Sequence, residues 1–307
     1  MICLLSLVYN ILYANRYIKM WGEKYMGKVI SVINMKGGVG KTTLTKELGY
    51  FMAKNKNKKV LFIDLDPQSN LTQSFFLNKK LRHQEDLNEP KQNLRLVSQS
   101  IQKLFDSSSI GKLKDSEVIL NLEQNFTVDL IPGTLSTIFL ERSSNSSNME
   151  RAVYNFIEEK ELKKKYDYIL IDCPPTYSVY TVSALLPSDF YFVPVDPGIY
   201  SVLGITMLEK VVNAIKEPNK LYFKDKPLRH LGVIFTRYNS DSDYLVDMIE
   251  TAKSLKNMYF FKERFLFSKK LVDRPLYFIS DNSDQRLLEN LNAIFDEMER
   301  RINGFEK

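Results

Sequence analysis

The sequence predicts an α/β fold, namely a single domain with a doubly wound, mostly parallel sheet and helices on both faces. From residue 28 onward, short apolar runs alternate with amphipathic stretches, which is the order expected when helices connect the strands of a parallel sheet. The 307 residues are 44% hydrophobic and 26% charged, close to ordinary globular proteins. This composition excludes wholesale disorder and a multi-span membrane protein, and the 12 glycines exclude fibrous classes.

Apolar runs mark the strands, and helical periodicity marks the helices between them. The expected strands are residues 29–34, 60–64, 128–131, 168–172, 190–195 and 231–236. The expected helices are residues 42–54, 149–165, 201–216, 243–256 and 284–302.

The last expected helix has a stripe of apolar residues on one face. They are Leu287, Leu288, Leu291, Ile294, Phe295, Met298 and Ile302. We expect this face to pack in the core. A membrane-binding or partner-binding face is the alternative, but Glu289, Asp296, Glu297 and Glu299 oppose binding to an anionic bilayer.

Two parts of the chain depart from the alternating pattern. Residues 1–27 begin with 15 uncharged residues, too few to span a membrane and without the basic start of a signal peptide. We expect an interfacial helix, a helix packed on the domain, or an extension upstream of a true start at Met20 or Met26. Within the domain at 28–307, the polar stretch 78–125 is expected to be a variable insertion with a short helix around 98–105.

Charge and cysteine content limit the functional classes. The net charge of +6 is compatible with a polyanionic partner without requiring one. The two cysteines, Cys3 and Cys173, exclude a disulfide framework and a four-cysteine zinc site, which suits a reducing cytoplasm. We expect the lysine clusters at 54–59 and 160–165 to be solvated, and His83 and His230 to lie in polar loops without chemistry.

Residues 29–52 have the features of a phosphate-binding loop, because a β-branched strand, a glycine-rich turn and an amphipathic helix follow directly on one another. Glycines let backbone N–H groups close around an anion, and the helix N-terminus adds partial positive charge. Lys41 can reach the outer phosphates of a nucleotide, and Thr42 offers a hydroxyl to Mg²⁺. All parts of the pattern agree, so a glycine turn that merely caps a helix is a poor alternative.

Carboxylates stand at two further strand ends. Asp64 and Asp66 are two residues apart, which places both on one side of a strand, and Asp172 ends a second apolar run as a Walker B acid does. In a sheet whose strands end beside the phosphate loop, these acids face the ligand crevice, where an isolated charge is costly without Mg²⁺ or water. Helix capping is the alternative role for Asp64 and Asp66. Asp172 is expected to hold the water shell of Mg²⁺.

The loop departs from the ordinary pattern G-x-x-x-x-G-K-[ST] in one respect. Met35 stands at the first glycine position, and a second lysine, Lys36, follows it. KGGVGKTT is a deviant Walker A motif, and with it the chain resembles the ParA/Soj/MinD superfamily of P-loop ATPases. The resemblance covers residue 28 to about residue 302, and is strongest before Ser74 and at 167–176. It implies a P-loop NTPase fold of the deviant Walker A type, with ATP and Mg²⁺ as cofactors.

The resemblance also implies roles for single residues. Lys36 would reach across a homodimer with sandwiched ATP to the phosphates bound by the second protomer. Asp66 would position or activate the attacking water, and Asp64 would support the Mg²⁺ shell. Cys173, in the turn DCPP, is expected to be a small filler. The implied nucleotide contacts are Lys36, Gly37, Gly38, Val39, Gly40, Lys41, Thr42, Thr43, Pro194, Asp196, Thr236, Arg237 and Asn239.

A ParA-type ATPase for plasmid or chromosome partition is the function that the resemblance favours. It implies ATP-dependent dimerisation, non-specific binding of double-stranded DNA, and release by hydrolysis that a ParB-like centromere-binding partner stimulates. A cytoplasmic, nucleoid-associated location follows from it. Residues 253–274 contain seven basic and two acidic side chains, and we assign the DNA-binding role there to Arg264, Lys269, Lys270 and Arg274.

Two other classes stay open. One is a MinD-like membrane-surface positioning ATPase, although the tail 300–307 is short and of mixed charge rather than a basic amphipathic helix. The other is a nucleotide-controlled DNA-binding scaffold with negligible hydrolysis. An iron protein is excluded because two cysteines are too few for its cluster.

Overall fold

The structure is a computed structural model that describes residues 26–84, 94–107, 109–137, 146–197, 201–236, 258–266, 268–274, 276–282 and 284–306. Several sequence predictions lie outside these residues. They are the extension 1–25, the nucleotide contacts Arg237 and Asn239, and the helix 243–256.

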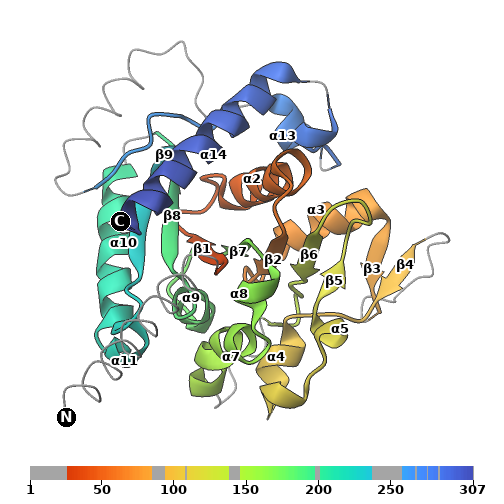
Figure 1. Cartoon of the computed structure of the whole chain (residues 1–307), viewed down its shortest axis with the longest axis vertical. Helices are drawn as coiled ribbons and strands as arrows, with labels where there is room; N and C mark the ends of the chain where they lie inside the picture. Colours follow the sequence, from red (N-terminus) through yellow and green to blue (C-terminus); the bar gives the residue numbers. More distant parts are fainter. Residues whose placement is uncertain are drawn as a thin grey trace, which may run out of the picture.

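A seven-stranded sheet in the order β5-β6-β2-β7-β1-β8-β9 forms the centre of the fold (Figure 1). All neighbouring strands are parallel except β5, which pairs antiparallel with β6 at one edge. This arrangement confirms the predicted doubly wound, mostly parallel sheet. The strands are β1 (Lys28–Val32), β2 (Val60–Asp64), β5 (Leu120–Asn121), β6 (Val128–Ile131), β7 (Tyr168–Asp172), β8 (Phe190–Val195) and β9 (Arg229–Phe235).

Helices cover both faces of this sheet (Figure 1). On one face, α2 (Lys41–Lys56), α3 (Asn70–Lys79) and α14 (Gln285–Phe305) contribute side chains to one apolar cluster. On the other face, α7 (Ser146–Glu159), α9 (Val179–Leu185) and α10 (Ser201–Lys216) contribute to a second cluster. The sheet therefore separates two cores, as the alternation of strands and helices along the chain predicts.

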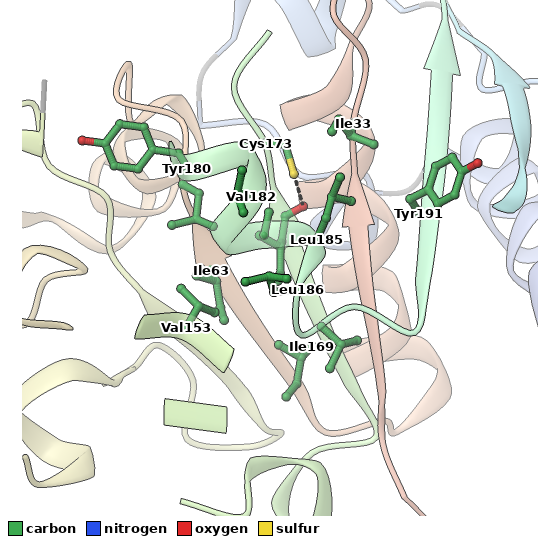
Figure 2. Close-up of a cluster of buried hydrophobic side chains, with 14 of the residues drawn as sticks. Ile33, Ile63, Val153, Ile169, Cys173, Tyr180, Val182, Leu185, Leu186 and Tyr191 are labelled. Carbon is green, nitrogen blue, oxygen red and sulfur yellow. Dashed lines mark hydrogen bonds between the residues drawn. The ribbon is translucent and has the colours of Figure 1, made fainter. Parts of the chain in front are cut away.

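The first strand shows how one sequence supplies both cores. Val29 packs in the cluster on the α7 face, and Ile30 and Val32 pack in the cluster on the α2 face. This alternation follows from the two-residue period of a strand, and each fully buried side chain of this size contributes about 1.5–3 kcal/mol. Figure 2 shows part of the α7-face cluster, in which Cys173 is fully buried and its thiol lies 3.8 Å from the carbonyl oxygen of Ile171. Cys173 is a small filler, as expected.

The polar stretch 78–125 contributes to the core more than a peripheral insertion would. It forms a small parallel pair, β3 (Leu81–His83) with β4 (Arg95–Val97), followed by α4 (Gln102–Asp106), η2 (Ile110–Lys112) and α5 (Asp115–Val118). Helix α4 lies close to the short helix expected around 98–105. Leu104 and Val118 are almost completely buried, and the same stretch ends in the edge strand β5.

Two expectations about charged and polar stretches are wrong. The helix expected at 149–165 is two helices, because Glu161 has a left-handed backbone (φ 51°) between α7 and α8 (Leu162–Lys165). Lys163 in this lysine cluster is buried rather than solvated, since its ammonium forms an ion pair with Asp189 at 2.8 Å.

The two histidines lie on strands rather than in loops. His83 in β3 is buried, and its Nε2 lies 3.1 Å from the carbonyl oxygen of Gly133. His230 in β9 packs on the ring of Tyr191, and burial lowers the pKa of its imidazole to about 4.

Helix α14 confirms that its apolar stripe packs in the core. Its apolar side chains are buried in the α2-face cluster, with Leu288 partly buried. Glu297 is also buried, and its carboxylate accepts hydrogen bonds from the Tyr259 hydroxyl and from the N–H groups of Lys262 and Glu263. Among the described residues, no helix has the length and apolar character needed to cross a membrane. The remaining short helices are α11 (Lys220–Phe223), α13 (Lys269–Asp273) and η3 (Ile279–Asp281).

Candidate nucleotide-binding site

Two glycines shape the loop between β1 and α2. Gly38 and Gly40 have φ angles of 74° and 83°, a left-handed conformation that strains residues with a side chain. A Cβ atom at Gly37 or Gly38 would meet no atom within 4 Å, so this part of the loop is open. An open loop of this kind, directly ahead of a helix N-terminus, is suited to bind a phosphate through backbone N–H groups.

Lys41, the first residue of α2, turns its ammonium back toward this loop. Its Nζ donates a hydrogen bond to the carbonyl oxygen of Lys36 at 3.2 Å, and only 6% of the residue is exposed. Burial lowers the pKa of Lys41, and the nearby carboxylates of Asp172 and Asp66 partly offset this effect. An ammonium has three donors, so this buried cation retains capacity to bind an anion.

Asp172 lies at the centre of the carboxyl edge of the sheet. In the parallel register of β7 it stands beside Val32 of β1 on one side and Asp64 of β2 on the other. Its Oδ2 accepts a hydrogen bond from the Thr42 hydroxyl at 2.7 Å, whereas its buried Oδ1 has no hydrogen-bond partner among the described residues. Burial raises the pKa of Asp172 well above its usual value, and the charges of Asp64 and Asp66 raise it further.

Asp64 is held by protein donors. Its Oδ2 accepts hydrogen bonds from the backbone N–H of Thr72 at 2.8 Å and from the Thr72 hydroxyl at 2.7 Å. Its Oδ1 lies 3.3 Å from the N–H of Asp66. Burial raises the pKa of Asp64 to about 7, although the hydrogen bonds from Thr72 act in the opposite direction. The predicted support of the Mg²⁺ shell by Asp64 would therefore act from a fixed position.

Asp66 is less deeply buried than the other two acids, with 7% of the residue exposed. One carboxylate oxygen accepts a hydrogen bond from the N–H of Gln68 at 2.9 Å. Burial raises the pKa of Asp66, and the N–H of Gln68 and the charge of Lys41 partly oppose this shift. Asp66 and Asp172 therefore share the ammonium of Lys41, and Asp64 adds a third carboxyl group beside Asp172.

These residues fit a divalent cation. The unpartnered oxygen of Asp172, the adjacent hydroxyl of Thr42 and the raised carboxyl pKa values describe a site short of positive charge. Oxygen donors of this kind suit Mg²⁺, which is ordinarily held by one or two protein groups together with water and phosphate oxygens.

The neighbouring strand ends fasten the phosphate loop from the other side. The Thr236 hydroxyl, after β9, donates a hydrogen bond to the carbonyl oxygen of Val39 at 2.6 Å. The Asn34 amide donates to the carbonyl oxygen of Pro194 at 2.8 Å. The structure thus brings Pro194 and Thr236 to the loop, as the sequence predicts, and their contact with a nucleotide stays a prediction.

Comparisons with known proteins identify the family of this chain. The AAA domain family AAA_31 matches residues 27–224. A ParA family protein of Chlamydia pneumoniae is 31% identical over 219 residues, which cover 69% of this chain and 72% of the relative. The chain is a ParA-type P-loop ATPase. It is also 29% identical to the sporulation initiation inhibitor protein Soj of Bacillus subtilis over 233 residues, covering 74% of this chain and 79% of Soj.

A solved structure shows the same fold. The AMPPNP complex of a putative plasmid partition protein from Borrelia burgdorferi B31 superposes with a TM-score of 0.64, covering 89% of this chain and 99% of that one at 23% identity. The superposition supports the ParA-type fold.

Within this ParA-type ATPase, Lys36 stands at the open part of the phosphate loop. Its backbone N–H donates a hydrogen bond to the Asn34 side chain at 3.0 Å, and its carbonyl oxygen accepts one from the Lys41 ammonium. No hydrogen bond or ion pair joins the Lys36 ammonium to another described residue. The side chain is therefore available to an external anion.

The basic residues assigned to DNA binding lie near α13. Lys269, Lys270 and Arg274 are exposed, and the Lys270 ammonium pairs with Asp284 at 3.0 Å. Lys270 and Arg274 line an open depression of about 410 Å³. Arg264 is half-buried, and its carbonyl accepts a hydrogen bond from the Asn290 amide at 2.8 Å. Three of the four residues are thus available at the surface near α13.

Sequence reasoning missed the residues that hold the acids in place. Thr72 binds Asp64 twice, and its hydroxyl also accepts a hydrogen bond from the N–H of Gly133 at 2.8 Å. A Cβ atom at Gly133 would lie 3.0 Å from the Asp64 carboxyl carbon, so a side chain there would press on the carboxyl group that Thr72 holds. The available signal was Thr72 itself, in the first turn of a helix that directly follows an acidic strand end.

Proposed function

We propose that this chain is a partition ATPase that binds ATP with Mg²⁺ at the carboxyl edge of its sheet and hydrolyses it. The observation that supports this most directly is the unbalanced cluster at Asp172, with a buried unpartnered oxygen beside the Thr42 hydroxyl and the Lys41 ammonium. Lys41 and the loop N–H groups bind the outer phosphates, and Thr42 and Asp172 hold Mg²⁺, which neutralises phosphate charge. Asp64 supports the shell of ligands around the Mg²⁺ ion.

We assign to Asp66 the role of orienting the attacking water. Its carboxylate is close enough to the Lys41 ammonium to affect its pKa, yet only one of its oxygens has a backbone donor, from Gln68. The second oxygen accepts a hydrogen bond from the water and orients it toward the terminal phosphate. Asp66→Ala should therefore bind ATP within about threefold of the parent while turnover falls at least about 100-fold. Isothermal titration and phosphate release measure the two, and a parallel loss of ATP affinity would make Asp66 a binding residue instead.

The unpartnered side chain of Lys36 supports a proposed dimer. Its ammonium has no partner among the described residues and stands at the open side of the loop, so it can reach the phosphates held by a second copy. ATP would then lie between two protomers. Lys36→Ala should largely preserve ATP binding but abolish the ATP-dependent shift from monomer to dimer in analytical ultracentrifugation.

Double-stranded DNA is the proposed macromolecular ligand, with contacts from Lys269, Lys270 and Arg274 and from Arg264 at the margin. Phosphate contacts carry no sequence information, so binding is non-specific. A ParB-like centromere-binding protein is the proposed partner that stimulates hydrolysis, and nucleoid association in the cytoplasm follows from DNA binding. The burial of the α14 apolar face in the core argues against a MinD-like membrane function through this helix.

The test uses Lys269→Glu with Lys270→Glu. Each phosphate contact contributes about 0.9 to the slope of log K against log salt, so the slope should flatten by about two units for unrelated duplexes. ATPase activity without DNA should stay unchanged. Lys164→Glu with Lys165→Glu is the matched control, because these two lysines are also exposed and neighbouring but lie on α8.

Two outcomes would contradict the DNA assignment. A double variant that binds DNA like the parent at every salt concentration places the contacts elsewhere. ATP-dependent sedimentation with anionic liposomes, without DNA binding, would favour the membrane-surface alternative.

A further inference from the structure

Helix α2 carries a buried ion pair one turn beyond its phosphate-binding end. Lys46 and Glu47 are 5% and 1% exposed, and the Lys46 ammonium lies 3.0 Å from Oε1 of Glu47. Removing two charges from water costs several kcal/mol per ion, and replacing such a pair by well-packed apolar side chains is often neutral or stabilising. The pair is therefore a poor source of stability, and its importance lies in what it holds in place.

Both side chains grip the segment that leads into α14. The Lys46 ammonium donates a hydrogen bond to the carbonyl oxygen of Tyr277 at 2.9 Å and lies 4.3 Å from the centre of the Phe278 ring. The Glu47 carboxylate accepts a hydrogen bond from the N–H of Ile279 at 2.8 Å. Adjacent residues of α2 thus bind backbone groups on either side of a fully buried phenylalanine.

The same face of α2 continues this contact farther along the helix. Tyr50 and Lys54 both reach the carboxylate of Asp281, with its Oδ1 3.1 Å from the Tyr50 hydroxyl and 2.6 Å from the Lys54 ammonium. The ring of Tyr50 also packs on Phe278, with 4.8 Å between ring centres. Residues 277–281 are therefore fixed to α2 along two turns of the helix.

The fixed segment is joined to the basic residues of α13. The N–H of Tyr277 donates to the carbonyl oxygen of Arg274 at 2.9 Å, and the N–H of Arg274 donates to that of Lys270 at 3.2 Å. One series of hydrogen bonds therefore leads from Lys46 to both basic residues. In the opposite direction along α2, Lys46 is five residues from Lys41, about 7.5 Å along the helix axis.

We propose that Lys46 and Glu47 are positioning residues that couple the phosphate loop to the DNA-contacting surface, so that ATP bound at Lys41 sets the placement of Lys270 and Arg274. This inference rests on the proposed function, because it takes double-stranded DNA to be the ligand of those two basic residues. A shift of α2 on binding ATP moves residues 277–279 with it, and α13 follows.

The first test is Lys46→Met with Glu47→Gln in the full chain, measured against a duplex of unrelated sequence. Methionine matches the length of lysine, and the glutamine carbonyl can still accept the Ile279 N–H, so the fold is retained. The ratio of DNA affinity with ATP to that with ADP should fall at least tenfold. ATPase activity without DNA should stay within about twofold of the parent, a difference of about 0.4 kcal/mol. An unchanged affinity ratio in the folded variant overturns the inference.

Lys56→Met is the matched control on the same helix. Its ammonium lies 3.4 Å from Asp296 of α14 and so contacts α14 rather than the segment 277–281. This variant should keep the parental ratio of DNA affinities. A loss equal to that of the double variant would show that any charge removed from α2 has this effect, and would overturn the role given to Lys46 and Glu47.

Hydrogen exchange separates failure of this inference from failure of the proposed function, because it needs no DNA. In the parent, a non-hydrolysable ATP analogue should increase protection of the amides of Arg274, Tyr277 and Ile279 relative to ADP. If the parent binds no DNA, the proposed function fails, and this nucleotide-dependent protection still decides the coupling. Equal protection with both nucleotides in the parent overturns the coupling, whether or not the double variant folds.

Discussion

The amino ends of the central strands and their carboxyl ends both bury charged side chains, and they differ in how those charges are balanced. At the amino ends, Asp189 lies between Lys163 and Lys226, with ammonium groups 2.8 and 3.2 Å from its oxygens. It also accepts a hydrogen bond from the N–H of Val29 at 2.8 Å. Burial alone would raise the pKa of Asp189, but the two lysines outweigh it and lower this pKa.

At the carboxyl ends the balance is reversed. Asp66 and Asp172 share the ammonium of Lys41, Asp64 lies beside Asp172, and burial together with mutual repulsion raises the pKa of Asp172. A buried charge with its partners present fastens strands together, whereas a buried carboxylate without them is costly and suits a cation supplied from outside. The contrast distinguishes a structural cluster from a binding site without reference to any bound molecule.

Asp189→Asn should have the largest effect, because it removes the anion that balances two lysines. We expect the free energy of unfolding to fall by about 3–5 kcal/mol, as when one partner of a buried ion pair is removed. Urea denaturation measures this change. ATP affinity should stay near the parental value, since the substitution lies at the other end of the strands.

The same chemical change at the carboxyl ends is the matched control. Asp172→Asn removes one of three crowded carboxylates while an amide oxygen can still accept from Thr42, so stability should be unchanged or rise by about 1 kcal/mol. A loss at Asp172 as large as that at Asp189 would show that both clusters are structural.

Lys41→Ala should have the next largest effect. We expect its affinity for Mg-ATP to fall at least about 100-fold, or about 2.7 kcal/mol. The loop N–H groups remain, but the charge that neutralises the outer phosphates is lost. Isothermal titration measures the affinity, with Lys56→Ala as a control on the same helix. Hydrolysis at the parental rate would disprove the assignment of Lys41.

A gradual effect on stability is expected from pH. The folded pKa of Asp64 is about 7, above its usual value of 3.8, so between these values the folded chain binds a proton that the unfolded chain has lost. Without nucleotide, the contribution of Asp64 should therefore lower stability as pH rises from about 4 to 7, by at most about 1.4 kcal/mol per pH unit. The contribution of Asp189 changes with pH in the opposite direction, because its pKa is lower in the folded chain than in the unfolded chain. Ionised Asp189 stabilises the fold above about pH 3.8, and this contribution is lost in stronger acid.

Urea denaturation across this pH range, in the parent and in Asp64→Asn, measures the effect. The difference in stability between the two should grow in favour of the variant as pH rises. A constant difference would mean that Asp64 is ionised throughout.

The sequence predicts the central strands and the phosphate loop well because their signals are local. The run 60–64 is uniformly buried, and Lys41 follows its glycines directly. Edge strand β5 was missed because Leu120–Asn121 has only two residues, too few to show the alternation of apolar and polar side chains that marks a strand. Helix α3 was missed because it is short and begins directly after the acidic turn at the end of β2. Its N-cap residue Ser69 makes no capping hydrogen bond, and its buried residues include Leu71 and Phe75.

Charge pairing across long stretches of sequence was the main limit. Nothing local distinguishes Lys163 from the lysines beside it, and its burial depends on Asp189, which lies 26 residues away. Likewise, Lys46 and Glu47 look like ordinary charges of an amphipathic helix until residues 277–279 close over them. The sequence therefore predicts which carboxylates end at the site, but not which buried charges are already balanced.

The dependence of ATP affinity on Mg²⁺, measured in the parent, in Asp172→Asn and in Asp189→Asn, distinguishes a cluster that binds a cation from one that is only structural. If the carboxyl-end cluster is completed by a cation, the parent should bind ATP at least about tenfold more tightly with Mg²⁺ than with a chelator, a difference of about 1.4 kcal/mol. Asp189→Asn should retain this dependence and Asp172→Asn should lose most of it. Equal ATP affinity in the parent with and without Mg²⁺, or full Mg²⁺ dependence in Asp172→Asn, would show that the cluster around Asp172 does not bind the cation.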